Sequence, residues 1–334
     1  MPQHSITVVG AGVFGLWQAL LLARAGHAVR LIEASAEPFA AAASRYAGVM
    51  LAPEREAEAG AEPELLRRLG REGVAMWREA CPDVITAGSI VVAGARDRAE
   101  LDRFAERTQG YERLDGKALA ALEPDLEGRF ANALYFAQEA HMPAPAALAH
   151  LLEEVRRAGV EVAFGASEAP AEGDFVIDCR GLAAQDALPD LRGVRGERVV
   201  VRSREIALTR PVQLLHPRHP LYVVPWGDGR YMVGATVIET EDAGAVTVRS
   251  ALELLGAAYA LHPAFGEAEI LELGAGIRPA FPDNVPRAIV REAGKRILVN
   301  GAYRHGFLLG PVLARAVRDY LDGGAVDELM RVES

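Results

Sequence analysis

The chain has 334 residues, half of them hydrophobic and a quarter charged, which is typical of a globular protein with room for two domains. Its net charge of −10 and isoelectric point near 5.4 argue against partners such as nucleic acid or anionic membrane surfaces. Cys81 and Cys179 are far apart and form no metal or redox motif, which favours a reducing cytoplasm. A first strand that begins near Ser5 leaves no room for a signal peptide, so we expect a cytoplasmic protein.

The N-terminal segment predicts a dinucleotide-binding β-α-β unit. An apolar strand leads into Gly10, Gly12 and Gly15, and a helix is predicted over residues 13–25. Gly10 permits a tight turn, Gly12 lets the backbone approach phosphates, and Gly15 lets the helix pack close to the strand. The positive end of that helix would face the pyrophosphate.

An acidic residue follows the second strand of this unit. The predicted strand over residues 28–32 delivers Glu33, about twenty residues past the glycines. A carboxylate there accepts hydrogen bonds from the adenosine ribose hydroxyls and disfavours a 2′-phosphate. A glycine turn without a ligand is the alternative, and the register of strand, helix and acid argues against it.

Helical and strand patterns alternate along the rest of the chain. We predict helices over residues 63–80, 97–108, 116–122, 146–158, 247–260 and 307–321. We predict strands over residues 89–93, 160–164, 174–179, 198–201, 222–225, 230–235, 268–275 and 296–300. Gly181 follows a buried strand, where backbone could meet the cofactor a second time, and Gly227-Asp228-Gly229 predicts a hairpin turn.

This alternation predicts an α/β fold, α+β overall, in which a Rossmann-like cofactor domain is interrupted by an antiparallel β-rich substrate domain. The cofactor domain is expected to comprise residues 1–50, 143–185 and 273–334. The substrate domain is expected to comprise residues 51–142 and 186–272.

Two arginines near the C-terminus are candidates for binding a carboxylate. Arg278 follows a strand and precedes Pro279, so its guanidinium could be held rigidly for two parallel hydrogen bonds, although a structural ion pair is an equal alternative. Arg304 lies just before the last predicted helix, where a cation is unfavourable unless an anion is near. The hydroxyl of Tyr222 could donate to the same carboxylate, although a core tyrosine is the simpler interpretation.

Together these segments resemble the FAD-dependent D-amino-acid oxidase superfamily, and within it the bacterial glycine oxidases of thiamine biosynthesis. The resemblance covers nearly the whole chain in order. It rests on the glycine turn with Glu33, Ser44 before Ala47-Gly48, Tyr222–Pro225 with Gly234-Ala235-Thr236, Gly276-Ile277-Arg278-Pro279, and Tyr303-Arg304-His305-Gly306.

The resemblance implies non-covalent FAD, since the C-terminal loop lacks the cysteine of relatives with covalent flavin. It also implies that the cofactor domain defined above binds FAD. The cofactor-binding residues are expected to be Gly10, Gly12, Val13, Phe14, Gly15, Glu33, Ser44, Ala47, Gly48, Val49, Gly181, Ala302, Tyr303, His305, Gly306, Phe307 and Leu308. By the same resemblance Arg278 takes the substrate carboxylate and Tyr222 and Arg304 assist.

The sequence departs from these relatives near the expected pocket. Arg45 and Tyr46 replace small residues, and Val237 stands where a larger methionine is common. Val237 is therefore expected to leave room beside the substrate Cα, whereas Arg45 and Tyr46 could close the entrance.

The resemblance implies FAD-dependent oxidative deamination of a small amino acid, most readily glycine, by hydride transfer to flavin N5 without an acid or base from the protein. Oxygen would reoxidise the flavin to give H₂O₂, and the imine could pass to a thiazole synthase. A D-amino-acid oxidase or dehydrogenase for larger or N-methylated substrates and a non-catalytic FAD-binding subunit are the alternatives. We expect a homo-oligomer, no bound metal, and no nucleic-acid or membrane partner.

Overall fold

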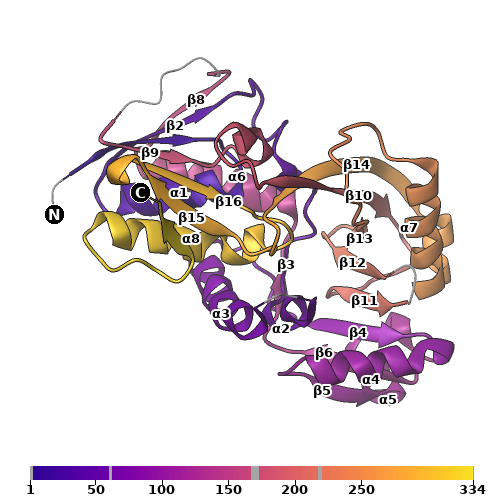
Figure 1. Ribbon diagram of the computed structural model, residues 1–334. Helices are drawn as coiled ribbons and strands as arrows, with labels where there is room; N and C mark the ends of the chain where they lie inside the picture. The colour runs from indigo at the N-terminus through magenta and orange to yellow at the C-terminus, as the bar shows by residue number, and fades with distance from the viewer. Residues whose placement is uncertain (1–2, 60–61, 167–172, 217–219, 334) are drawn as a thin grey trace.

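The computed structural model describes residues 3–59, 62–166, 173–216 and 220–333, and two β-sheets lie side by side in it (Figure 1). The N-terminal strands and the C-terminal helix belong to the same half of the molecule, as Figure 1 shows by colour. Segments from opposite ends of the chain therefore meet in one half, and the mixed α/β fold that the sequence predicts is confirmed.

The first sheet has seven strands in the order β17-β15-β16-β9-β1-β2-β8. All pairs in this sheet are parallel except β15 with β16. Its strands are β1 (Ser5–Val9), β2 (Ala28–Glu33), β8 (Glu161–Phe164), β9 (Phe175–Asp178), β15 (Arg287–Arg291), β16 (Arg296–Asn300) and β17 (Met330–Val332).

Helices α1 (Val13–Arg24), α6 (Ala144–Arg157) and α8 (Gly306–Leu321) pack with this sheet into one hydrophobic core. Helix α1 is buried from Val13 to Leu22 because apolar side chains surround it on nearly all sides. Helix α8 contacts α1 closely, so the last helix of the chain lies beside the first (Figure 1).

The second sheet has eight strands in the order β14-β10-β13-β12-β11-β4-β6-β5. All pairs are antiparallel except β11 with β4. Its strands are β4 (Ser89–Ala93), β5 (Glu112–Asp115), β6 (Asn132–Phe136), β10 (Arg192–Arg202), β11 (Val212–Leu215), β12 (Leu221–Pro225), β13 (Arg230–Gly234) and β14 (Glu269–Ala280). Helices α4 (Arg98–Arg107), α5 (Gly116–Leu122) and α7 (Val248–Leu261) accompany it.

Short elements join the two halves. Strands β3 (Met50–Leu51) and β7 (Ala140–His141) pair with each other, and helices α2 (Pro53–Glu56) and α3 (Pro63–Ala80) lie between the sheets (Figure 1). Strand β14 runs from the second sheet to the C-terminal loop, where the backbone N–H of Tyr303 donates to the carbonyl of Pro279 over 2.8 Å. This strand therefore carries Arg278 to the boundary between the halves.

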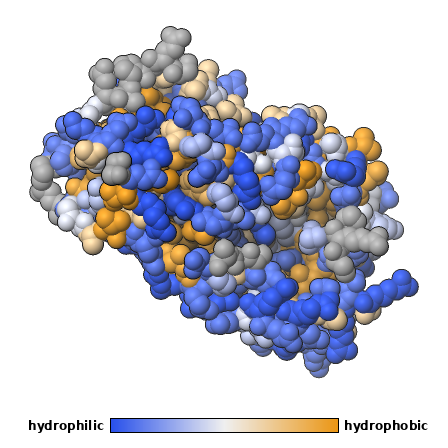
Figure 2. Space-filling model, viewed as in Figure 1, coloured by the Kyte–Doolittle hydropathy of each residue, from blue (hydrophilic) through white to orange (hydrophobic). Residues whose placement is uncertain are grey.

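The surface in Figure 2 is largely hydrophilic, with hydrophobic residues scattered over both halves, some of them at the end of the molecule where α7 lies. Val248 and Leu252 on α7, and Ile270 and Leu273 on the edge strand β14, are exposed there. Within the described ranges, no helix combines the length and the apolar character that crossing a bilayer requires.

Candidate functional site

A cavity of about 330 Å³ opens between the two halves. Elements from three distant parts of the chain line it, namely the segment after β2, the second sheet, and the start of α8. Of the residues predicted for the site, those in the cavity wall are Val13, Ser44, Ala47, Gly48, Val49, Tyr222, Val237, Arg278, Ala302, Tyr303, Arg304, Gly306 and Phe307.

The glycine turn lies at the N-terminus of α1. Gly10 has φ of +97°, and a Cβ there would lie 2.6 Å from the carbonyl oxygen of Cys179. A Cβ at Gly15 would clash with the carbonyl oxygen of Gly10, so the protein itself requires both glycines. A Cβ at Gly12 would meet only Ser44 Oγ, at 3.8 Å, which leaves open space on that side of the turn.

Two polar features fit a phosphate group beside this turn. Ser44 Oγ is buried, and the described residues offer it no hydrogen-bond partner. Gly12 precedes helix α1 and offers no side-chain cap, so the first N–H groups of the helix are available to an anion. An unpaired buried hydroxyl and an uncapped helix N-terminus are the donors that a pyrophosphate needs.

Glu33 ends β2 beside the turn. Its Oε2 accepts from the N–H of Ala11 over 2.7 Å and its Oε1 accepts from the N–H of Ser35 over 2.9 Å. Each carboxylate oxygen can accept more than one hydrogen bond, so both retain capacity for ribose hydroxyls. The predicted ribose contact remains a prediction.

Several predicted cofactor residues lie outside the cavity wall, and they are Gly10, Gly12, Phe14, Gly15, Glu33, Gly181, His305 and Leu308. The Phe14 ring packs near Gly310 of α8, and Leu308 packs against Gly70 of α3. Gly181 has φ of +60° and its carbonyl accepts from Asn300 Nδ2 over 2.8 Å. For Phe14 and Leu308 any contact with a cofactor would therefore come from the backbone.

Arg278 extends from β14 into the cavity. Among the described residues its guanidinium makes no ion pair, and Nη1 donates to the carbonyl of Thr236 over 3.2 Å. It lies over Gly196 of β10, where any Cβ would clash with the guanidinium. Burial lowers the pKa of Arg278 below its ordinary value, and an arginine nevertheless stays charged. A fixed cation without a protein counter-ion is suited to an anionic ligand.

Tyr222 and Arg304 lie near this guanidinium. Burial raises the pKa of the Tyr222 hydroxyl above its ordinary value, whereas the charges of Arg278 and Arg304 act in the opposite direction. The hydroxyl therefore stays protonated at neutral pH and can donate a hydrogen bond. Arg304 is exposed, and the described part of the chain supplies it with no ion pair.

The residues at which the sequence departs from its relatives occupy different places. Val237 lines the cavity and is 51% exposed, so its side chain is at the mouth. Tyr46 also lines the cavity, and its ring lies against Gly274 and Gly276 of β14. Arg45 lies over the Tyr46 ring, with 5.5 Å to the centroid, and is absent from the cavity wall.

Sequence reasoning missed Glu56 at the end of α2. It lines the cavity, and its Oε2 accepts a hydrogen bond from Nδ1 of His305 over 2.6 Å. The ring of His305 is thus directed at Glu56, although His305 was predicted to bind cofactor. No local pattern around Glu56 signals a site, because α2 approaches α8 only in the folded chain.

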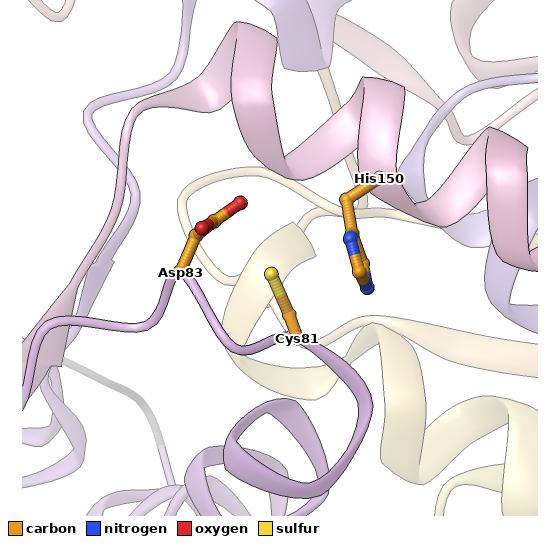
Figure 3. Close-up of side chains that lie close together, drawn as sticks. All are labelled: Cys81, Asp83 and His150. Carbon is orange, nitrogen blue, oxygen red and sulfur yellow. The ribbon is translucent and has the colours of Figure 1, made fainter.

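One group of potential metal ligands lies outside the cavity (Figure 3). Cys81, Asp83 and His150 each place a ligand atom within 4.8 Å of the others, although the sequence predicted no metal motif at Cys81. Nε2 of His150 donates to the carbonyl of Ala80 over 2.8 Å. Burial raises the pKa of the Cys81 thiol, which favours the protonated form over the thiolate that a metal would bind.

Comparisons with known proteins identify the family of the chain. The chain matches the DAO family, described as FAD dependent oxidoreductase, over residues 5–320. It is 52% identical over 314 residues to a Rhizobium etli protein with the provisional name thiamine biosynthesis oxidoreductase ThiO, a match covering 93% of this chain and 94% of the relative. It is 23% identical over 357 residues to the bifunctional protein ThiO/ThiG of Trichormus variabilis, covering 98% of this chain and 54% of that longer protein.

Among solved structures, glycine oxidase from Bacillus cereus superimposes with a TM-score of 0.80 at 25% identity, covering 96% of this chain and 95% of that one. The family match spans most of the chain, and the open glycine turn with its unpaired donors fits the cofactor of that family. The chain belongs to the DAO family and is an FAD-dependent oxidoreductase.

Proposed function

We propose that this enzyme oxidises a small amino acid, glycine first, to the imine, which hydrolyses to the oxo acid and ammonia while O₂ is reduced to H₂O₂. The single observation that carries the proposal is the guanidinium of Arg278, which lies half-buried in the cavity wall without an ion-pair partner among the described residues. The chain resembles a protein named for thiamine biosynthesis. This resemblance supports the proposal that the product is the imine of glyoxylate and that thiamine biosynthesis uses it.

The residues of the chain bind and orient the substrate. Arg278 offers two parallel N–H donors to a carboxylate, and Tyr222 can add a third from its protonated hydroxyl. Bound FAD, non-covalent in our proposal, supplies the acceptor for two electrons and a proton. Arg278 lines the same cavity as Gly306 and Phe307. A carboxylate fixed by its guanidinium would hold the substrate in one orientation, and orientation then contributes much of the rate.

We also propose that the cofactor-binding domain comprises residues 1–50, 143–185 and 273–334 and that residues 51–142 and 186–272 form the substrate domain, with Arg278 reaching the substrate from the first of these. All seven strands of the first sheet fall within the ranges of the cofactor-binding domain, which supports the division. The exposed apolar residues of α7 and of edge strand β14 support a homo-oligomer, which light scattering of the purified protein would test.

An anaerobic substrate panel tests the proposed reaction. Glycine, sarcosine, D-alanine, D-proline and D-phenylalanine are mixed separately with the yellow protein, and the loss of flavin absorbance is followed. Glycine should bleach the flavin, and sarcosine or D-alanine should do so within about tenfold of it. One methyl group changes binding by about 1–3 kcal/mol, and the room that Val237 leaves favours the lower end of that range. Peroxide should form when air is admitted.

Each other result points to an alternative. Faster bleaching by D-phenylalanine than by glycine would indicate an oxidase of larger D-amino acids. Failure of every amino acid to bleach the flavin would contradict the proposal and favour a non-catalytic FAD-binding subunit. Transfer of the imine to a thiazole synthase is our proposal for its fate, and the name of the ThiO/ThiG relative supports it.

A further inference from the structure

Three glycines leave one stretch of the second sheet without side chains. Gly274, Gly276 and Arg278 alternate along β14, so they share one face of the sheet. Gly196 of β10 pairs with Gly276 in the antiparallel ladder, and both glycines line the cavity. Opposite residues of such a ladder have Cβ positions only about 4.5–5.5 Å apart on the same face. Large side chains can therefore lie directly against this stretch of backbone.

Tyr46 and Arg278 occupy this stretch next to each other. A Cβ at Gly274 would lie 2.8 Å from the Tyr46 ring, and a Cβ at Gly276 would lie 2.9 Å from it. The guanidinium of Arg278 lies over Gly196, which is directly opposite Gly276. The ring and the guanidinium are therefore neighbours on one face of the sheet, and both residues line the cavity.

A buried cation holds the Tyr46 ring in place. Arg198 is buried, and its guanidinium carbon lies 5.3 Å from the centroid of the Tyr46 ring and 5.3 Å from that of Trp226. Its Nη2 donates to Glu272 over 3.1 Å, whereas Nε and Nη1 have no hydrogen-bond partner among the described residues. A guanidinium that is removed from water interacts favourably with aromatic faces. Packed against Arg198 and the backbone of β14, the Tyr46 ring has little room to shift.

We propose that Tyr46 limits the size of the substituent on the substrate Cα. This inference rests on the function proposed above, in which Arg278 takes the substrate carboxylate. The Cα is bonded directly to that carboxylate, so its substituent lies close to the guanidinium and to the ring beside it. Because the ring cannot shift, a bulky substituent overlaps with it, and such overpacking is unfavourable. Tyr46 thus makes the enzyme selective for glycine and other small amino acids.

Two matched pairs of ligands test this assignment on the holoenzyme with FAD in excess. Glycine and D-phenylalanine are compared by kcat/KM in peroxide assays. Acetate and hydrocinnamate, which are the same two molecules without the amine, are compared by dissociation constants from the change in flavin absorbance. Tyr46→Ala should raise kcat/KM of D-phenylalanine relative to glycine at least about tenfold, because one methylene group in an apolar pocket already changes discrimination about 10–200-fold. The affinity for hydrocinnamate relative to acetate should rise by a similar factor.

Further variants serve as controls. Tyr46→Phe keeps the ring and should keep both wild-type ratios. Arg45→Ala removes a side chain that lies over the same ring but outside the cavity wall, and it should also leave both ratios unchanged. Tyr46→Leu should give intermediate ratios and covers the case in which the alanine variant does not fold.

The outcomes separate the two proposals. If Tyr46→Ala and Tyr46→Leu keep both wild-type ratios, or if Arg45→Ala shifts the ratios equally, the assignment of Tyr46 is overturned while the oxidase function stays intact. If the wild type oxidises no amino acid, the oxidase function fails, and the two carboxylates still test Tyr46 through binding alone.

Discussion

At the residue scale, Arg278 is the most informative side chain. Removing its bidentate contact in Arg278→Ala should cost about 2–5 kcal/mol of substrate binding, which lowers kcat/KM on the best amino acid by a factor of roughly 30 to several thousand. Arg278→Lys should restore it only in part, because an ammonium cannot reproduce the planar fork. Steady-state peroxide assays measure kcat/KM of both variants. A near-normal kcat/KM of Arg278→Ala would contradict the role of Arg278 in binding the substrate carboxylate.

Gly196→Ala tests the position of Arg278 while keeping its charge. A Cβ at residue 196 would clash with the Arg278 guanidinium, so this variant should displace Arg278 and raise KM although all charges remain. FAD content should stay at the wild-type level, because Gly196 lies on β10 of the second sheet.

Residues in local motifs could be placed from the sequence, and residues that depend on remote contacts could not. Arg278, Tyr222 and Gly306 each belong to a short segment with its own pattern, and all three line one cavity, while their roles stay predictions. Glu56 was missed because its partner His305 lies 249 positions further along the chain. That Ser44 Oγ is buried without a hydrogen-bond partner among the described residues likewise depends on the folded turn.

At the element scale, the contact of α3 with α8 supports the start of α8, where Gly306 and Phe307 line the cavity. Pro311 lies inside α8 and has no N–H, so the carbonyl of Phe307 lacks its helical donor. Nε1 of Trp77 supplies that donor over 2.6 Å. Trp77→Phe should lower the free energy of unfolding by about 1–3 kcal/mol in urea titrations, because a buried carbonyl loses its partner.

Trp17→Phe is the matched control for this prediction. Trp17 is also buried and contacts Trp77 edge-on with ring centroids 5.0 Å apart, yet its Nε1 has no hydrogen-bond partner in the described residues. Trp17→Phe should therefore cost packing only. A loss for Trp17→Phe as large as that for Trp77→Phe would show that the hydrogen bond contributes nothing.

Most helices matched their predicted ranges, whereas strands of the second sheet were harder to predict. Helix α3 spans the predicted residues 63–80, and the turn at 227–229 joins β12 to β13 as predicted. Strand β10 runs from Arg192 to Arg202, although only residues 198–201 were predicted. Buried charges, including the pair of Arg195 with Glu197 at 2.6 Å, hide the apolar pattern of its first half.

At the scale of the whole molecule, the two halves meet at a buried polar junction. Arg55 of α2 pairs with Glu139 beside β7, and Ser89 of β4 donates to the same carboxylate. His141 of β7 is fully buried there, and both its ring nitrogens lack partners among the described residues. Sequence patterns predicted the two halves, but such a junction depends on side chains from separate segments and left no local signal.

The last prediction concerns acid stability of this junction. Burial, followed by the charges of Arg55 and Arg210, lowers the pKa of His141 from 6.5 to about 4. The unfolded chain therefore binds this proton more readily, so the stability that a neutral His141 provides is complete above pH 6.5 and is lost as pH falls toward 4. The shift corresponds to about 3 kcal/mol.

With saturating FAD held constant, urea titrations of wild type should show this loss of stability between pH 6.5 and 4, and His141→Asn should flatten the dependence on pH. His150→Asn, at a half-buried position outside the junction, should keep the wild-type slope, and a wild-type slope in His141→Asn would contradict the assignment.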